Sequence, residues 1–257
     1  MKIIKYTKKS ANKYNILLEN QESISLYSDL ILKYNLLILK EIDKNTLEAI
    51  KKDNLKLELY YKTLKYLKSI KCTKDVKEYL KAYDSSLSNY VIDRLKKERY
   101  LDDNNYIKAY INTKVLLSND GYYKIYNYLQ NKDLDKISIK EELDLITDDT
   151  WLEKIKRIVN TKLKTNSKDS KNMVIMKLKN YLKNLGYPDC LINQVLITIK
   201  VDNSKEEANL KKEYTKLYNK YKNKYDSRKL NYILVGKLLK KGYDLEKVKT
   251  LVGTSDL

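Results

Sequence analysis

Leu182-Lys183-Asn184-Leu185-Gly186-Tyr187 and Leu238-Leu239-Lys240-Lys241-Gly242-Tyr243 are two copies of one short pattern, and they decide the fold class of this 257-residue chain. Each copy ends a run of helical spacing with glycine, the residue that most readily closes a helix in a left-handed conformation. An acidic residue follows, and then a second apolar run at helical spacing that begins at Leu191 or Leu245. The pattern predicts a mainly helical chain in which one arrangement of helices recurs.

Weaker copies of the pattern occur at Ala82-Tyr83-Asp84 and Asp133-Leu134-Asp135. The four boundaries, at residues 82, 133, 186 and 242, are separated by 51, 53 and 56 residues. A period of this length fits three helices per unit, and units of this size need to stack to bury a core. We therefore expect about four tandem three-helix repeats that form an elongated, curved body, over residues 56–101, 102–147, 148–202 and 203–257.

Residues 1–55 follow a different pattern, because apolar residues alternate with polar ones around a turn at Asn20-Gln21. Asp43 and Asn45 are both possible N-caps for a helix farther along. We expect a small N-terminal β-hairpin followed by helices, with strands at Tyr14–Asn20, Glu22–Leu26 and Ile3–Tyr6 and helices at Ser28–Tyr34 and from about Asp43 to Lys52.

The charge of the chain is strongly positive and unevenly distributed. There are 53 basic and 34 acidic residues, for a formal net charge of +19. Residues 151–257 hold 25 basic and 11 acidic residues and so carry +14 of this charge. The abundance of Lys, Asn, Ile and Tyr is typical of an AT-rich genome and accounts for part of the total, but a uniform bias does not polarise charge. The excess favours an acidic partner, above all nucleic acid.

Basic residues cluster on the predicted helices of the last two repeats. As a set they predict a positive surface that follows phosphates or an acidic protein groove, although any single one also fits an ordinary solvated helix face. Arg157 and Arg228 stand out because a guanidinium can make bidentate contacts. The candidate filament- or DNA-binding residues are Lys154, Lys156, Arg157, Lys162, Lys164, Lys177, Lys179, Lys183, Lys222, Lys224, Arg228, Lys229, Lys240 and Lys241.

Two other segments receive different interpretations. The stretch from Asp133 to Asp149 is acidic and is expected to face protein or solvent rather than DNA. The tyrosines from Tyr214 to Tyr225 recur at helical spacing, which is more typical of a core stripe than of a base-stacking platform. The chain has 25 tyrosines and no phenylalanine, so tyrosine hydroxyls at core positions need a partner or a route to solvent.

Composition argues against catalysis. The chain has no histidine, which removes the commonest general base and zinc ligand. The carboxylate pairs Asp102-Asp103 and Asp148-Asp149 each precede a predicted helix and are interpreted as caps. Cys72 has no histidine to activate it as a nucleophile and is expected to be a small buried or half-buried side chain. No phosphate-binding glycine motif is present, so we predict no catalytic, cofactor-binding or metal-binding residues and no cofactor.

The N-terminus has no apolar run typical of a signal peptide. The most apolar stretch, Leu30 to Leu39, is too short to span a bilayer. We expect a cytoplasmic, monomeric protein with no membrane partner, and two cysteines as distant as Cys72 and Cys190 are consistent with a reducing compartment.

The stretch from Arg99 to Ile111 resembles the signature of the RecX family of recombination regulators. It contains a turn, then Leu101-Asp102-Asp103, and then Tyr106, Ala109 and Tyr110 on the following helix. The Gly-Tyr boundaries, the three-helix period and the N-terminal strands resemble the longer members of that family over nearly the whole chain. Two positions depart from the pattern, because Arg99 and Asp133 stand where the family usually has glycine.

The resemblance implies a regulator of the RecA recombinase in recombination, DNA repair and the SOS response. Members bind the groove of the RecA–DNA filament, inhibit ATP hydrolysis, strand exchange and filament growth, and contact single- or double-stranded DNA through the filament or directly. They are not known as enzymes. Two alternatives stay open at this point: a general basic DNA-binding or architectural protein that acts without RecA, and a helical adaptor for another protein.

Overall fold

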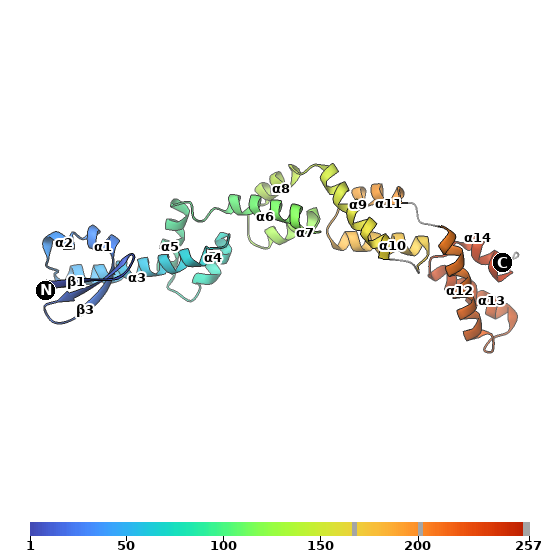
Figure 1. Cartoon of the computed structure of the whole chain (residues 1–257), viewed down its shortest axis with the longest axis horizontal. Coiled ribbons are helices and arrows are strands. Elements are labelled where there is room, and N and C mark those ends of the chain that lie inside the picture. Colours follow the sequence, from blue (N-terminus) through green and yellow to red (C-terminus); the bar gives the residue numbers. More distant parts are fainter. Residues whose placement is uncertain (166–168, 200–202, 254–257) are drawn as a thin grey trace. The chain divides into compact units, whose positions relative to one another are not determined.

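The structure of the protein is a computed structural model that describes residues 1–165, 169–199 and 203–253. Over these residues the chain is mainly helical, with a small antiparallel sheet near the N-terminus (Figure 1). The predicted mainly helical fold class with a small N-terminal sheet is therefore confirmed. The chain divides into two compact units, Met1–Tyr106 and Ile107–Leu257.

The sheet of the first unit has three strands in the order β1-β2-β3, each antiparallel to the next. The strands are β1 (Ile3–Ser10), β2 (Lys13–Leu18) and β3 (Ser23–Tyr27). The register places Ile16 between Tyr6 and Ile24. The predicted strands are thus all present, and β1 continues beyond its expected end at Tyr6.

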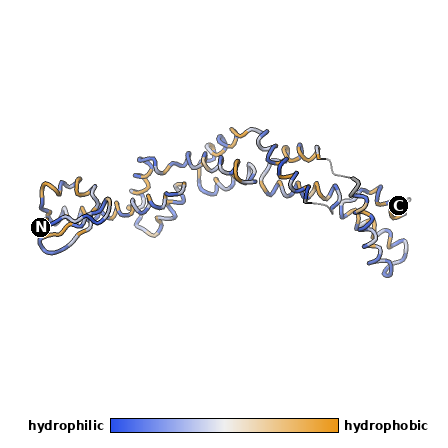
Figure 2. Tube along the Cα trace, in the orientation of Figure 1, coloured by the Kyte–Doolittle hydropathy of each residue, from blue (hydrophilic) through white to orange (hydrophobic). Residues whose placement is uncertain are grey.

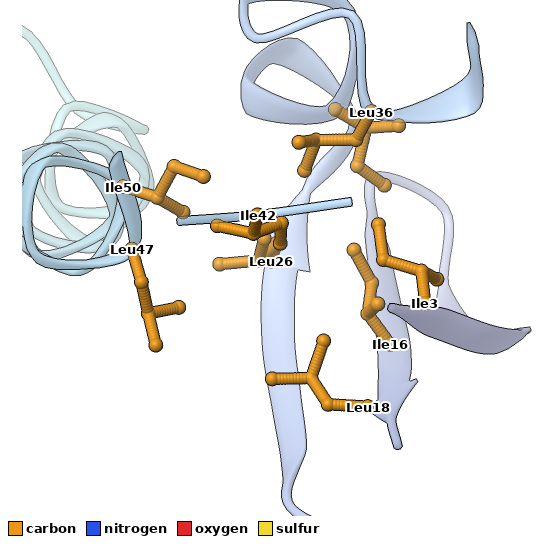
Figure 3. Packing of buried hydrophobic residues seen from close by; sticks show 9 residues of the cluster. Ile3, Ile16, Leu18, Leu26, Leu36, Ile42, Leu47 and Ile50 are labelled. Atoms are coloured by element: carbon orange, nitrogen blue, oxygen red, sulfur yellow. The ribbon is translucent and has the colours of Figure 1, made fainter. Parts of the chain in front are cut away.

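Helices α1 (Ser28–Lys33), α2 (Leu36–Leu39) and α3 (Lys44–Tyr66) follow the sheet. Apolar residues from the strands and from these helices form one buried cluster (Figure 3). The members labelled in Figure 3 come from the strands, from α2 and α3, and from the segment just before α3. They are Ile3, Ile16, Leu18, Leu26, Leu36, Ile42, Leu47 and Ile50.

Helix α3 is longer than the sequence pattern predicts. Asp43 is its N-cap and accepts the backbone N–H of Thr46. The helix does not end near Lys52, because no glycine or proline follows nearby and Leu57, Leu59 and Tyr60 continue its buried face. The predicted boundary at residues 55 and 56 therefore falls inside one continuous helix.

The C-terminal part of α3 packs against α4 (Thr73–Leu80) and α5 (Ser85–Lys97). Tyr60, Val76 and Leu95 are buried in this second cluster. Cys72 precedes α4 and is fully buried, as expected. Asp102 accepts the N–H groups of Asn104 and Asn105, so the first carboxylate of this pair is a helix cap.

The remaining helices, α6 to α14, follow in the order that the chain runs. The division between the two units falls inside α6. Their bounds are α6 (Asp103–Leu117), α7 (Tyr122–Gln130), α8 (Lys136–Asp144), α9 (Asp148–Thr165), α10 (Lys171–Asn184), α11 (Asp189–Ile197), α12 (Asn203–Tyr221), α13 (Ser227–Lys240) and α14 (Leu245–Val252).

Hydrophobic and hydrophilic residues alternate along each of these helices (Figure 2). The apolar faces of α12, α13 and α14 meet in one cluster around Leu210, Leu234, Leu238 and Val248. The division into four three-helix repeats stays a prediction, and residue 202 at its last boundary lies outside the described residues.

The two Gly-Tyr patterns lie where one helix end docks against the start of an earlier helix. Gly186 has a φ of 87°, and its carbonyl accepts the N–H of Tyr123 at 2.8 Å, at the start of α7. Gly242 has a φ of 80°, and the preceding carbonyl, of Lys241, accepts the hydroxyl of Ser170 at 2.6 Å, at the start of α10. These contacts fix the positions of α10 and α13, which carry many of the candidate basic residues.

Three buried or half-buried tyrosines have a hydrogen-bond acceptor for their hydroxyl groups. Tyr187 donates to the carbonyl of Asn119 at 3.1 Å, and Tyr6 donates to the carbonyl of Leu36 at 2.8 Å. Tyr60 donates to the carboxylate of Glu98. At these three positions tyrosine is compatible with the core because its hydroxyl reaches an acceptor.

Candidate nucleic-acid interface

The candidate residues on α9 and α10 are mostly exposed. Lys179 is half-buried, and Lys154 is buried. The exposed members are Lys156, Arg157, Lys162, Lys164, Lys177 and Lys183.

Lys154 does not belong to the surface that the sequence predicts. Its side chain is only 6% exposed, and its Nζ donates to the carbonyl of Lys114 at 3.3 Å and to the carbonyl of Asp120 at 3.2 Å. Burial lowers its pKa to about 8, with a further contribution from Arg157. The prediction that Lys154 contacts a polyanion is therefore wrong, because the spacing of α9 turns this lysine toward the end of α6.

Three other candidates are paired with carboxylates. Lys177 lies 2.7 Å from Asp169, and Lys183 lies 2.9 Å from Asp189. Lys241 pairs with Glu213. These pairs are at least partly exposed, so each contributes little to stability, but each partner offsets the charge that a phosphate would meet.

A second group of candidates gathers at one end of the α12–α13 hairpin. Lys222 and Lys224 lie in the turn after α12, and Arg228 and Lys229 lie in the first turn of α13. All four are exposed. Lys240 lies at the opposite end of α13, about 18 Å away at 1.5 Å per residue. The structure therefore brings Lys222, Lys224, Arg228 and Lys229 together and separates them from Lys240 and Lys241.

A pocket of about 190 Å³ adjoins Arg157. Arg157, Thr161 and Lys162 of α9 line it together with Asn119 and Tyr181, and Lys162 Nζ lies 4.6 Å from the centre of the Tyr181 ring. Ile158 completes the lining, which includes no carboxylate among the described residues. Two cations and several hydrogen-bonding groups around a small hollow suit a phosphate group.

The sequence interpretation missed two exposed tyrosines at the α12–α13 end. Tyr214 and Tyr221 are half-buried and pack against the core, as the stripe predicts. Tyr218 and Tyr225 are instead 39% and 37% exposed. In the sequence these tyrosines alternate with lysines, and this pattern could have indicated that their rings are exposed.

The described residues contain no group of three or more metal-ligating side chains that could hold an ion. Burial raises the pKa of the Cys72 thiol, which leaves it protonated at neutral pH. Among the described helices, none has the length and apolar character needed to cross a membrane.

Together, the fold and this surface define a mainly helical protein whose exposed basic residues suit a polyanionic partner. Comparisons with known proteins then place it more closely. The regulatory protein RecX of Streptococcus pneumoniae strain CGSP14 is 30% identical over 260 residues, which cover 96% of this chain and 97% of the relative. RecX of Streptococcus agalactiae strain A909 is 29% identical over 259 residues, covering 97% and 98%. The chain belongs to the RecX family of regulatory proteins.

Solved structures agree with this fold. A crystal structure of regulatory protein RecX superposes with a TM-score of 0.66 at 19% identity, over 76% of this chain and 98% of the other. The crystal structure of RecX from Lactobacillus salivarius gives a TM-score of 0.52 at 24% identity, over 55% and 94%. No family model matches the chain.

Proposed function

We propose that this protein regulates the RecA recombinase by binding the RecA–DNA filament and lowering its ATPase activity, strand exchange and growth. The observation that carries the proposal is membership of the RecX family over nearly the full length. The role is binding rather than catalysis, in DNA repair, recombination and the SOS response, by a cytoplasmic monomer.

The charge distribution supports a partner that presents phosphates or carboxylates. The basic residues at the α12–α13 end and around the Arg157 pocket are exposed on one compact unit, Ile107–Leu257. Such charge speeds association with a polyanion and makes its affinity depend on salt. We propose that these residues contact the filament, and that Lys154 does not.

The test is the DNA-dependent ATPase of RecA, titrated with this protein at low salt. We expect inhibition as the protein approaches stoichiometric amounts. A variant with Arg157→Ala, Arg228→Ala and Lys229→Ala should need higher concentrations, whereas replacing the exposed Lys5, Lys8 and Lys9 of β1 by alanine should change little. An ATPase rate that does not respond to the wild-type protein would exclude the proposal.

A general DNA-binding role is the second candidate, and the exposed tyrosines and lysines at the α12–α13 end favour it. It differs in one measurable way, because it needs no RecA. Binding to RecA-coated and bare DNA, compared at two salt concentrations, separates the two roles. A preference for the coated DNA supports the filament regulator, and equal binding supports the general role.

A further inference from the structure

The segment between Glu213 and Asp226 combines aromatic and basic residues in an unusual density. Residues 214–225 include four tyrosines and four lysines and no carboxylate. Asp226 follows, but its Oδ1 accepts the N–H of Lys229 at 2.9 Å as the cap of α13. The next acidic residue along the chain is Asp244. The positive charge of this segment is therefore not balanced by acidic residues within it.

The tyrosine rings form a row along one side of α12 and into the turn after it. Tyr214 and Tyr218 stack with centroids 5.9 Å apart and an interplanar angle of 25°. Tyr221 and Tyr225 lie 6.2 Å apart at 34°. The spacing of three and four residues places successive rings on neighbouring turns of the helix.

Two of the four tyrosines pack against the core, and the other two are exposed. Tyr214 and Tyr221 pack against the cluster that contains Leu210 and Leu234, which restricts their movement. Tyr218 and Tyr225 rest beside them with more than a third of each residue exposed. A partly exposed ring that stacks on a neighbour fixed by the core loses little entropy when a flat ligand packs against it.

Lysines lie over two of the four rings, those of Tyr221 and Tyr225. Lys229 Nζ lies 5.5 Å from the Tyr225 ring centre, and Lys220 and Lys237 lie 5.6 and 5.1 Å from that of Tyr221. A hydrogen bond from Lys237 and the charges of nearby lysines lower the pKa of the Tyr221 hydroxyl. The rings therefore sit in a positive field of the kind that phosphates on either side of a base require.

We propose that the α12–α13 end is a binding site for an unpaired DNA strand, in which bases stack on Tyr218 and Tyr225 and Lys220, Lys222 and Lys224 contact the phosphates. A duplex hides its base faces, so the rings add affinity only for an unpaired strand. An acidic peptide would use the lysines but would have no use for the exposed part of the Tyr218 and Tyr225 rings. The site deepens the proposed function, on which it rests for DNA as the ligand.

The first test needs no variant. The wild-type protein is titrated into three labelled DNAs of about 20 nucleotides: oligothymidylate, an abasic strand with the same phosphates, and a duplex. Fluorescence anisotropy reports the affinity. We expect the oligothymidylate to bind about tenfold or more tighter than the abasic strand, because stacking contributes about 1–3 kcal/mol per base. Equal affinity for the three DNAs, or tighter binding of the duplex, overturns the proposal.

The second test changes the rings. Replacing Tyr218 and Tyr225 by alanine should lower affinity for oligothymidylate about tenfold or more and leave the abasic strand unaffected, whereas replacing both by phenylalanine should preserve binding. Tyr100→Ala removes a tyrosine that is 59% exposed in the other unit and is the matched control. Alanine variants that keep their circular dichroism and bind like the wild type overturn the site.

The results also separate this inference from the proposed function. If the RecA ATPase responds to the protein while the three DNAs bind equally, the stacking site fails and the filament regulator stands. If the ATPase does not respond while binding of oligothymidylate depends on Tyr218 and Tyr225, the stacking site stands and the filament regulator fails.

Discussion

Single residues explain the two departures of this chain from the signature of its family. Arg99 and Asp133 have φ angles of 60° and 57°, in the left-handed region that Gly186 and Gly242 also occupy. An L-residue adopts this region at a cost of about 1–2 kcal/mol, which glycine avoids. The backbone therefore keeps the conformation even where glycine is replaced, and the surrounding helices hold it there.

Arg99→Gly should stabilise the protein. The side chain of Arg99 is exposed, and the gain from relaxing its φ outweighs the added freedom of glycine in the unfolded chain by about 0.5–1 kcal/mol. Thermal unfolding followed by circular dichroism measures the change. A matched control is Arg94→Gly, which lies inside α5 and should destabilise. A lower midpoint for Arg99→Gly would contradict this account.

Lys154 gives the protein a specific dependence on pH. Its pKa is about 8 in the folded protein and 10.5 without burial, so between these values the unfolded chain binds more protons. The free energy of unfolding therefore rises with pH across this window, by roughly 2–3 kcal/mol from this residue. The neutral amine still has two N–H donors for the carbonyls of Lys114 and Asp120.

The comparison with Lys154→Met isolates this contribution, since other groups that titrate above pH 8 are common to both proteins. Urea unfolding at about pH 8 and about pH 9.5, followed by the fluorescence of Trp151, should show the wild type gaining stability relative to the variant. Trp151 is the single tryptophan of the chain and reports on the unit that contains Lys154. Parallel pH dependence in both proteins would show that Lys154 is not deprotonated.

At the scale of helices, acidic side chains on one helix cap the start of another. Asp103 in α6 accepts the N–H of Thr73 at 2.7 Å, at the start of α4. Glu206 in α12 accepts the N–H of Lys171 at 3.1 Å, at the start of α10. Both carboxylates satisfy an orphan N–H at the positive end of a helix dipole. These contacts and the Gly-Tyr docking points together set the relative positions of helices within each compact unit.

Gly186→Ala should disrupt such a docking point. A Cβ at this position would lie 2.4 Å from the backbone nitrogen of Lys124, and the φ of 87° is unfavourable for alanine. We expect a loss of about 2 kcal/mol or more, measured by urea unfolding with Trp151 fluorescence. Gly236→Ala is the matched control, because nothing lies near its Cβ and it sits inside α13, so it should gain about 0.5–1 kcal/mol. Equal effects of the two substitutions would refute the docking role of Gly186.

At the scale of the whole molecule, the main feature is the concentration of charge in residues 151–257, which carry +14 of the +19. Binding of DNA releases counterions in proportion to the phosphates contacted, so the slope of affinity against salt counts these contacts. The salt dependence of DNA affinity should therefore depend more on where the basic residues lie than on the net charge of the protein.

Replacing Lys222, Lys224, Arg228 and Lys229 by glutamine should reduce the slope of log affinity against log salt for an unpaired strand, by up to about 3. Replacing the exposed Lys5, Lys8, Lys9 and Lys44 of the first unit removes the same charge and should leave the slope nearly unchanged. Fluorescence anisotropy at several salt concentrations gives both slopes. The same reduction in both variants would show that net charge alone governs binding.

Local patterns in the sequence predicted much of the fold and part of the candidate site. The strands, the helix ends at Gly186 and Gly242, and the caps at Asp43 and Asp102 depend on residues a few positions apart, so spacing and turn chemistry reveal them. Most of the lysines named as candidates are exposed, because a solvated helix face is a periodic feature. The end of α3 was missed because its continuation depends on the packing of Leu59 and Tyr60 against segments farther along the chain.

The sequence by itself determined the helical class, the strand-containing N-terminus and the concentration of positive charge in residues 151–257. Only the tertiary structure decided that Lys154 is buried and that Tyr218 and Tyr225 are open to solvent. The physical reason is distance along the chain. The carbonyls that Lys154 contacts belong to residues 114 and 120, and the exposure of each tyrosine depends on how α13 and α14 cover α12. Helical spacing places a side chain on a face, but only packing against distant segments determines whether that face meets water.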